Sequence, residues 1–211
     1  KTTRLDRSVR FKMATEGQSV DLGFVEKVGK LESLCSFFFP SKVGGKPSWL
    51  DLENLPVSNL LLCNECKKPM IFLLQVYAPL SENEHCFHRT LFLFCCKNGQ
   101  CYKQNSSKCF AVFRSQLGKE NKFYSSKPPP DINDEFLDLD KVKKDVDRFI
   151  ESNNLHKLCS LCGCKADKQC SGCHAMSYCS REHQTIDWKA GHKVVCKHIQ
   201  DSGQQLLVFH T

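Results

Sequence analysis

Residues 159–196 read CSLCGCKADKQCSGCHAMSYCSREHQTIDWKAGHKVVC, and they decide how this part of the chain folds. Eight of these residues have the side chains and the spacing of zinc ligands. A Cys-x2-Cys pair places two sulfurs on one tight turn, and a spacing of four places two ligands on one face of a helix. The stretch therefore predicts two zinc sites with four ligands each, and the spacing alone leaves their pairing open. The predicted ligands are Cys159, Cys162, Cys170, Cys173, Cys179, His183, His192 and Cys196.

A disulfide framework is the alternative explanation for so many cysteines. The chain has 15 cysteines, an odd number that cannot all pair within one chain, and most of them have metal-ligand spacing. We therefore expect reduced thiols and a reducing compartment. The longest uncharged stretch, residues 69–81, is too short and too polar to span a bilayer, so no membrane partner is expected.

The net charge of +7 suggests an acidic partner at first sight. Zinc ligands are thiolates, however, and their ionisation lowers the net charge of the metal-loaded chain. No segment of the sequence is a dense basic stripe. We therefore expect no direct contact with nucleic acid.

Residues 21–124 have the pattern of a β-rich domain. Short apolar and aromatic runs alternate with turn signals such as residues 40–47 and Asn98-Gly99. The runs Met70–Tyr77 and Thr90–Cys96 have the length and composition of buried strands, and we expect them at the centre of a curled antiparallel sheet. Residues 1–20 are polar and basic and are predicted to form a flexible tail.

A third zinc site is predicted inside this domain. Cys63 and Cys66 precede one predicted strand, and Cys96 and Cys101 follow the other, so pairing of the strands would bring two turns together as a zinc ribbon. Cys95 competes with Cys96 for the third position, because adjacent strand residues point to opposite faces and only one of them can join the site. Three further residues are able to replace one cysteine, namely His85, Cys86 and His88.

Residues 125–154 are predicted to connect two domains. Three consecutive prolines within residues 125–134 hold the chain extended, which marks a linker. An amphipathic helix follows, with apolar residues at intervals of three or four. This helix either docks on a neighbouring surface or is a connector without a partner of its own. The apolar positions are Phe136, Leu139, Val142, Val146 and Phe149.

The sequence does not favour an enzyme. No cysteine, serine or histidine has a convincing pairing of nucleophile and base, and a closed four-ligand zinc site leaves no position for a catalytic water. Gly44-Gly45 lies between prolines and is typical of a turn instead of a phosphate loop. The remaining cysteines, Cys35, Cys109 and Cys164, are expected to be small apolar residues of the core.

The segment from residue 155 to 198, with Tyr178-Cys179-Ser180 and His183-Gln184, resembles a MYND zinc finger. His183 stands where most fingers of this family carry cysteine. The resemblance implies interleaved sites, one formed by Cys159, Cys162, Cys179 and His183 and the other by Cys170, Cys173, His192 and Cys196. It also implies a groove for proline-containing peptides at Gln184 and Trp188. A core position on the helix is the alternative interpretation of Trp188.

Four further strings resemble the programmed cell death protein 2 family, and this resemblance covers about residues 20–198. They are residues 21–24 (DLGF), 39–50 (FPSKVGGKPSWL), 74–80 (LQVYAPL) and 87–89 (FHR). The expected fold class is mainly β with a small zinc-stabilised α+β module. The order would be a curled antiparallel β domain carrying a zinc ribbon, then a helix, then a MYND zinc finger.

The family resemblance implies a chaperone that captures one newly made small-subunit ribosomal protein and supports 40S ribosome assembly in the cytoplasm and nucleus. A corepressor adaptor that binds proline-containing peptides through the finger is the alternative. The resemblance also implies an acidic stretch and a second β-rich half beyond residue 211. Residues 199–211 are therefore expected to be the C-terminal tail of a truncated chain. Within residues 1–211, the acidic patch in residues 131–147 is the part that would contact a basic client.

Overall fold

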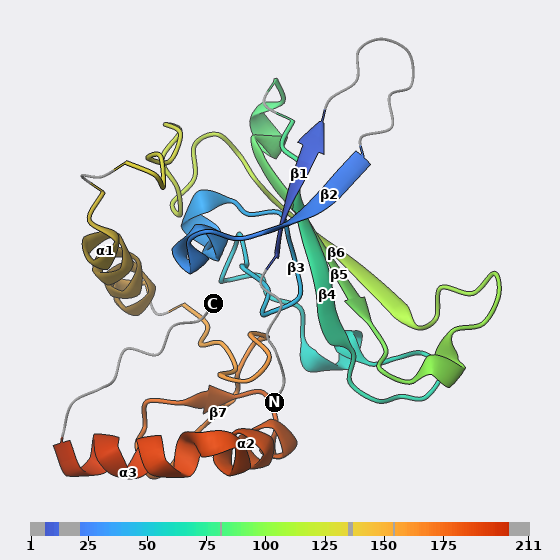
Figure 1. Ribbon diagram of the computed structural model, residues 1–211, viewed down its shortest axis with the longest axis vertical. Coiled ribbons are helices and arrows are strands. Elements are labelled where there is room, and N and C mark those ends of the chain that lie inside the picture. Colours follow the sequence, from blue (N-terminus) through green and yellow to red (C-terminus); the bar gives the residue numbers. More distant parts are fainter. Residues whose placement is uncertain (1–6, 13–21, 81, 135–136, 154, 203–211) are drawn as a thin grey trace.

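The computed structural model describes residues 7–12, 22–80, 82–134, 137–153 and 155–202. Within these ranges, one antiparallel sheet of six strands is the main element of the β-rich domain, in the order β2-β1-β3-β4-β5-β6 (Figure 1). The predicted mainly β class is therefore confirmed. The strands are β1 (Arg7–Lys12), β2 (Leu22–Lys27), β3 (Lys42–Val43), β4 (Ile71–Tyr77), β5 (His88–Cys95) and β6 (Phe110–Leu117).

The two strands predicted at the centre of the sheet are β4 and β5. They pair with each other in antiparallel register, with Ile71 opposite Cys95 and Tyr77 opposite Thr90. Alternate residues of β5 point into the core, and Phe92 and Phe94 are fully buried there. This pairing places the start of β4 beside the end of β5, which is where both cysteine pairs of the predicted ribbon lie.

The segment predicted to be a turn at residues 40–47 contains the short strand β3, which joins β1 to β4. Gly44 has a φ of 77° and allows the chain to reverse directly after this strand. Lys42 is buried, and its Nζ donates a hydrogen bond of 3.2 Å to the carbonyl oxygen of Leu34. Lys42 therefore links β3 to the segment that contains Leu34 from within the core. The charge of a lysine does not predict such a buried position.

Residues 7–12 form a strand, although residues 1–20 are predicted to be a flexible tail. β1 pairs along its length with β2, where Val9 lies opposite Val25, and then with β3, where Ser8 lies opposite Lys42. A polar sequence can form such a ribbon because pairing of the strands satisfies the hydrogen-bonding groups of its backbone. The other residues of the predicted tail, 1–6 and 13–20, lie outside the described residues.

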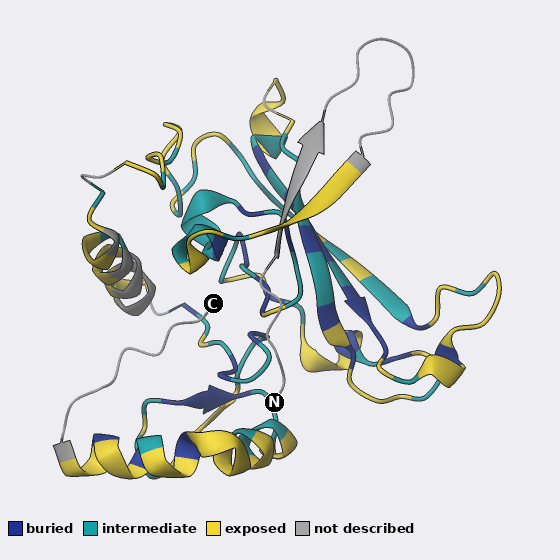
Figure 2. Cartoon of the chain, viewed as in Figure 1, coloured by how far each residue is buried: buried dark blue, intermediate teal, exposed yellow. Residues whose placement is uncertain are grey.

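The predicted linker helix is present as α1 (Leu139–Ser152), which Figure 2 shows beside the β-rich domain. Lys30 donates a hydrogen bond of 2.7 Å from Nζ to the carbonyl oxygen of Ile132 in the preceding linker. Val142 is half-buried. The other predicted apolar positions, Phe136 and the side chains of Leu139, Val146 and Phe149, lie outside the described residues, so docking of this helix remains a prediction.

The C-terminal module contains a small ribbon and a kinked pair of helices. In Figure 1 its helices lie on the side away from the sheet. Among the described residues, no helix combines the length and hydrophobicity that crossing a bilayer requires. The elements are β7 (Lys168–Gln169), β8 (Ser177–Tyr178), α2 (Arg181–Asp187), a π-helical turn (Trp188–His192) and α3 (Lys193–Ser202). Short 3-10 helices in the β-rich domain span Leu31–Leu34, Ser36–Phe38, Ser58–Leu61, Glu84–Cys86 and Gly99–Cys101.

Candidate metal centres

Three clusters of cysteine and histidine side chains are able to bind zinc. In each cluster the four ligand atoms lie within 4.8 Å of one another. They coincide with the three ligand sets expected from the sequence. The clusters are Cys63, Cys66, Cys96 and Cys101; Cys159, Cys162, Cys179 and His183; and Cys170, Cys173, His192 and Cys196.

Each Cys-x2-Cys pair lies on a tight turn closed by a backbone hydrogen bond. The amide of Lys67 donates to the carbonyl of Cys63 at 2.8 Å, that of Gly163 to Cys159 at 2.8 Å, and that of His174 to Cys170 at 3.0 Å. Lys67, Gly163 and His174 all have positive φ, between 52° and 71°. In each turn, the residue after the second cysteine has the left-handed conformation and reverses the chain, so that both sulfurs point to one centre.

The ribbon cluster takes Cys96 instead of Cys95. The sulfurs of Cys66 and Cys96 are 3.6 Å apart, and the amide of Asn98 donates to the Cys96 sulfur at 3.3 Å. Cys95 is buried but lies outside the cluster, as the opposite orientation of adjacent strand residues requires. Cys101 reaches the site from the 3-10 turn Gly99–Cys101, at whose start the Asn98 side chain accepts a hydrogen bond of 3.1 Å from the amide of Gln100.

The other candidates for this site are held elsewhere. His85, Cys86 and His88 lie near the opposite end of β5 from Cys96. The side-chain nitrogen Nε2 of Gln116 donates a hydrogen bond of 3.0 Å to the Cys86 sulfur. Nδ1 of His88 is 2.9 Å from the hydroxyl oxygen of Tyr77, and the His88 ring stacks on Phe39 at 4.4 Å.

The finger positions its remaining ligands with a helix cap and a kink. Ser180 caps α2 by accepting a hydrogen bond of 3.1 Å from the amide of His183. Gly191 has a φ of 148° and kinks the chain between α2 and α3. Immediately after this kink, His192 and Cys196 lie one helical turn apart, so both side chains reach the same centre.

The distances within the finger fit tetrahedral zinc. With zinc–sulfur bonds of about 2.3 Å, two thiolates on one ion lie about 3.8 Å apart. The Cys162 and Cys179 sulfurs are 3.6 Å apart, and those of Cys170 and Cys196 are 3.8 Å apart. Nε2 of His192 lies 3.8 Å from the Cys173 sulfur. The ligands thus alternate between two sites along the chain, in the interleaved arrangement that the family resemblance implies.

The electrostatics of the clusters also favour a bound cation. The backbone amide of Cys66 is the main reason that the pKa of Cys63 falls to about 7, whereas burial raises the pKa of Cys101 in the same cluster to about 12. Hydrogen bonds with the sulfurs of Cys159 and then Cys179 raise the pKa of His183 to about 10. Neighbouring thiolates repel one another, so the cysteines of one cluster can all ionise only beside a divalent ion, whose binding displaces their protons and the extra proton of a charged histidine.

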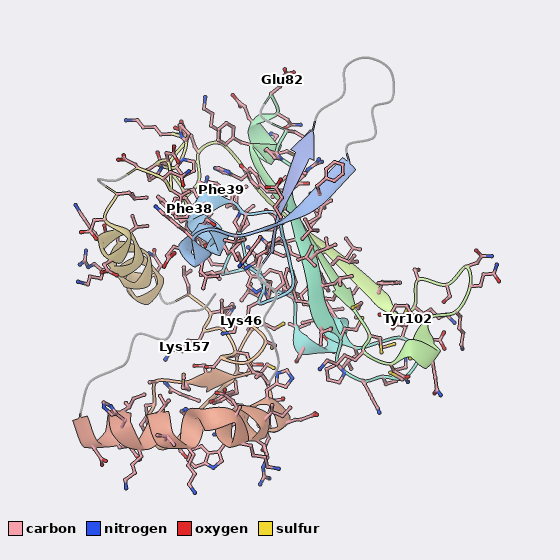
Figure 3. The ribbon with its side chains drawn as sticks, viewed as in Figure 1. Phe38, Phe39, Lys46, Glu82, Tyr102 and Lys157 are labelled. Carbon is pink, nitrogen blue, oxygen red and sulfur yellow. The ribbon has the colours of Figure 1, made fainter. Side chains whose placement is uncertain are left out.

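The finger is joined to the β-rich domain through its first cysteine turn. The indole nitrogen of Trp49, which is buried in the β core, donates a hydrogen bond of 2.7 Å to the carbonyl oxygen of Gly163. Cys164 belongs to the same hydrophobic cluster as Trp49 and Phe92. Lys46 packs so closely that a Cβ on Gly163 would lie 2.8 Å from the Lys46 Cβ; Figure 3 labels Lys46 where the two parts meet.

Sequence reasoning missed this junction, because it links positions more than a hundred residues apart. The one available signal is Gly163 itself, the glycine between Cys162 and Cys164. The result for Cys164 agrees with its expected role as a small apolar core residue, since it is buried and lies outside the metal clusters.

The residues predicted to bind peptides lie on one face of the finger helices. Gln184 and Trp188 are four positions apart, and Trp188 is 39% exposed. Its ring packs against that of His192 in T-shaped geometry, with ring centroids 5.6 Å apart. Ile186 on the same helix is also exposed. The partial exposure of Trp188 is compatible with contact to a ligand while one edge supports a metal-binding histidine.

Comparison with known protein families gives two matches. The family described as "Programmed cell death protein 2, N-terminal domain" matches residues 19–131, and the MYND finger family matches residues 159–196. The chain belongs to the programmed cell death protein 2 family. The first match includes the ribbon cluster, and the second begins and ends at zinc-type ligands of the finger. No solved structure shows significant similarity to the chain.

Curated relatives support this family assignment. Programmed cell death protein 2 of Rattus norvegicus is 44% identical over 178 residues, which cover 84% of this chain and 48% of the rat protein. The Mus musculus protein is 45% identical over 177 residues, covering 84% and 48% of the two chains, and the Bos taurus protein is 44% identical over 186 residues, covering 87% and 50%. The chain spans about half the length of these relatives.

Proposed function

We propose that the chain is a non-enzymatic zinc-binding adaptor and chaperone. It captures a newly made small-subunit ribosomal protein and supports 40S ribosome assembly, in the cytoplasm and nucleus. The observation that supports a structural role for the metal is the composition of the clusters. Each cluster contains four protein ligands, which fill the tetrahedral coordination of zinc and leave no place for a catalytic water.

In this proposal the two parts of the chain have different roles. The β-rich domain holds the client, and the MYND finger recruits other proteins through Gln184 and Trp188. The junction at Trp49 and Gly163 supports this division, because it fixes the orientation of the finger relative to the sheet. A fixed orientation lets a partner on the finger act on a client held by the neighbouring domain.

Client capture by residues 1–211 alone is expected to be weak. A client rich in lysine and arginine needs acidic surface, and exposed acids in the linker and α1 include Asp131, Asp138 and Asp145. Lys141 and Lys144 interrupt this patch. A pull-down of ribosomal proteins from a translation extract at moderate salt measures capture, with a full-length relative as reference. Recovery of full capture by residues 1–211 would contradict this prediction.

The corepressor adaptor is the second candidate function, and the exposed ring of Trp188 favours it. A Trp188→Ala variant separates the two functions. We expect it to lose binding to proline-rich peptides while it still captures the ribosomal client, since the sheet is unaffected. Native mass spectrometry showing three zinc ions verifies that the finger stays folded despite the lost contact with His192.

Two outcomes would count against this assignment. Loss of client capture from a Trp188→Ala variant that keeps its three zinc ions would show that the finger, and not the sheet, holds the client. If neither the unchanged chain nor the full-length relative enriches a small-subunit ribosomal protein above a control bait, the chaperone function is wrong.

A further inference from the structure

The zinc ribbon carries a group of lysines that neither the clusters nor the proposed client requires. Five exposed lysines surround this site, against a single acid, Glu65, in the two segments 62–71 and 96–110. They are separated in the sequence, but the shared metal site brings their segments together. We call them the ribbon lysines: Lys67, Lys68, Lys97, Lys103 and Lys108.

Contacts between the two segments place these lysines close to one another. Nζ of Lys103 lies 2.7 Å from one carboxylate oxygen of Glu65, and Nζ of Lys108 lies 3.7 Å from the other. Lys67 and Lys97 directly follow Cys66 and Cys96, whose sulfurs are 3.6 Å apart. Glu65 balances one positive charge, and four thiolates with one zinc ion would add two negative charges. The surface therefore remains positive.

An aromatic ring is fixed among these lysines. The hydroxyl of Tyr102 donates a hydrogen bond of 2.7 Å to the carbonyl oxygen of Cys96, and its ring packs against Phe110 in T-shaped geometry, with ring centroids 5.4 Å apart. Tyr102 is nevertheless 46% exposed as a residue. Figure 3 labels it at the end of the β-rich domain that lies away from α1. Gln100 and Gln104, two positions before and after Tyr102 in the sequence, are exposed as well.

We propose that the zinc ribbon of this chain binds single-stranded RNA, although the sequence, in which no segment is a dense basic stripe, predicts no contact with nucleic acid. Lysines attract the phosphates, an exposed and immobilised aromatic ring stacks on an unpaired base, and amides hydrogen-bond to base edges. An acidic protein segment would use the lysines but has no base to stack on Tyr102. The ring therefore favours RNA over an acidic peptide as the partner.

The test is fluorescence anisotropy with a labelled oligouridine of about 12 nucleotides, titrated at several salt concentrations into the unchanged chain. Three lysines that make no ion pair with Glu65 are changed together, as Lys67→Gln, Lys68→Gln and Lys97→Gln. If they contact three phosphates, the slope of log affinity against log salt decreases by about 2. The matched control changes the same charge on the exposed finger surface, as Lys189→Gln, Lys193→Gln and Lys197→Gln, and is expected to leave this slope unchanged.

A second variant tests the ring without changing charge. Tyr102→Leu is expected to weaken oligouridine binding about tenfold and to leave the salt slope unchanged, because stacking and not charge is lost. Polyglutamate is the competing probe. If polyglutamate binds as tightly as oligouridine and Tyr102→Leu has no effect, the partner is an acidic protein and the proposal is wrong.

Ultraviolet crosslinking of oligouridine to the unchanged chain gives a result that does not depend on any variant folding. Crosslinks are expected on the peptide that contains Tyr102. Absence of oligouridine binding, or crosslinks confined to the finger, overturns the proposal. Neither result bears on client capture, so failure of this inference is distinguishable from failure of the proposed chaperone function.

Discussion

A Cys96→Ser variant is expected to bind two zinc ions instead of three and to lose the folded structure of the β-rich domain. Zinc contributes about 10–16 kcal/mol to the folding of small zinc-binding modules, whereas a whole domain is stable by only about 5–15 kcal/mol. Cys96 also belongs to the hydrophobic cluster that contains Phe94 and Trp49, so loss of the metal exposes the core directly. Native mass spectrometry measures the zinc content, and near-ultraviolet circular dichroism measures the packing of the aromatic core.

The adjacent cysteine provides a matched control. Cys95 is also buried, with 6% of its surface exposed against 3% for Cys96, but it lies outside the cluster. Cys95→Ser should keep three zinc ions and lose about 1 kcal/mol of stability, as expected for a small polar change in a core. Equal zinc content in the two variants would contradict the ligand set. A folded Cys96→Ser domain with two ions would show that the ribbon metal is dispensable.

The zinc ligands could be predicted from the sequence because their geometry is local. A Cys-x2-Cys turn and a four-residue helical spacing each bring two ligands together without help from the rest of the chain. The choice between Cys95 and Cys96 could not be made in this way. The choice depends on which face of β5 is directed toward Cys63 and Cys66, and the pairing of β5 with β4 determines that face.

Several features that depend on contacts distant in sequence were not predicted. Residues 7–12 look like a polar tail, but pairing with β2 and β3 makes them a strand. Lys42 looks like a surface residue of a turn, but the carbonyl of Leu34 allows it to be buried. The ribbon lysines show the same effect for charge, since neither of their two segments is a basic stripe until the metal site joins them.

The second large effect is expected from Gly163→Ala, at the junction between finger and sheet. The new Cβ would lie 2.8 Å from the Cβ of Lys46 and 3.0 Å from the Cδ of Pro47, and neither neighbour can retreat without moving the backbone. The φ of 71° adds strain, because a residue with a Cβ is destabilised by about 1 kcal/mol in the left-handed conformation. With overpacking, the total loss of stability is expected to be about 2–4 kcal/mol.

The variant should separate the finger from the sheet while both keep their zinc. Trp49 reports this separation, because its indole loses the hydrogen bond to the Gly163 carbonyl and gains water. The chain has two tryptophans, so the measurement is made in a Trp188→Phe background, where red-shifted emission comes from Trp49 alone. Urea unfolding followed by the same signal gives the change in stability.

Gly191→Ala is the control that distinguishes a local strain from a lost junction. Gly191 also has a positive φ, of 148°, but a Cβ there would meet no atom within 4 Å. This change therefore strains the finger without touching the sheet, and the emission of Trp49 should stay as in the unchanged chain. If Gly163→Ala also leaves that emission unchanged and three zinc ions bound, the sheet and the finger are independent bodies. The finger would then have no fixed orientation from which to present a partner to a client on the sheet.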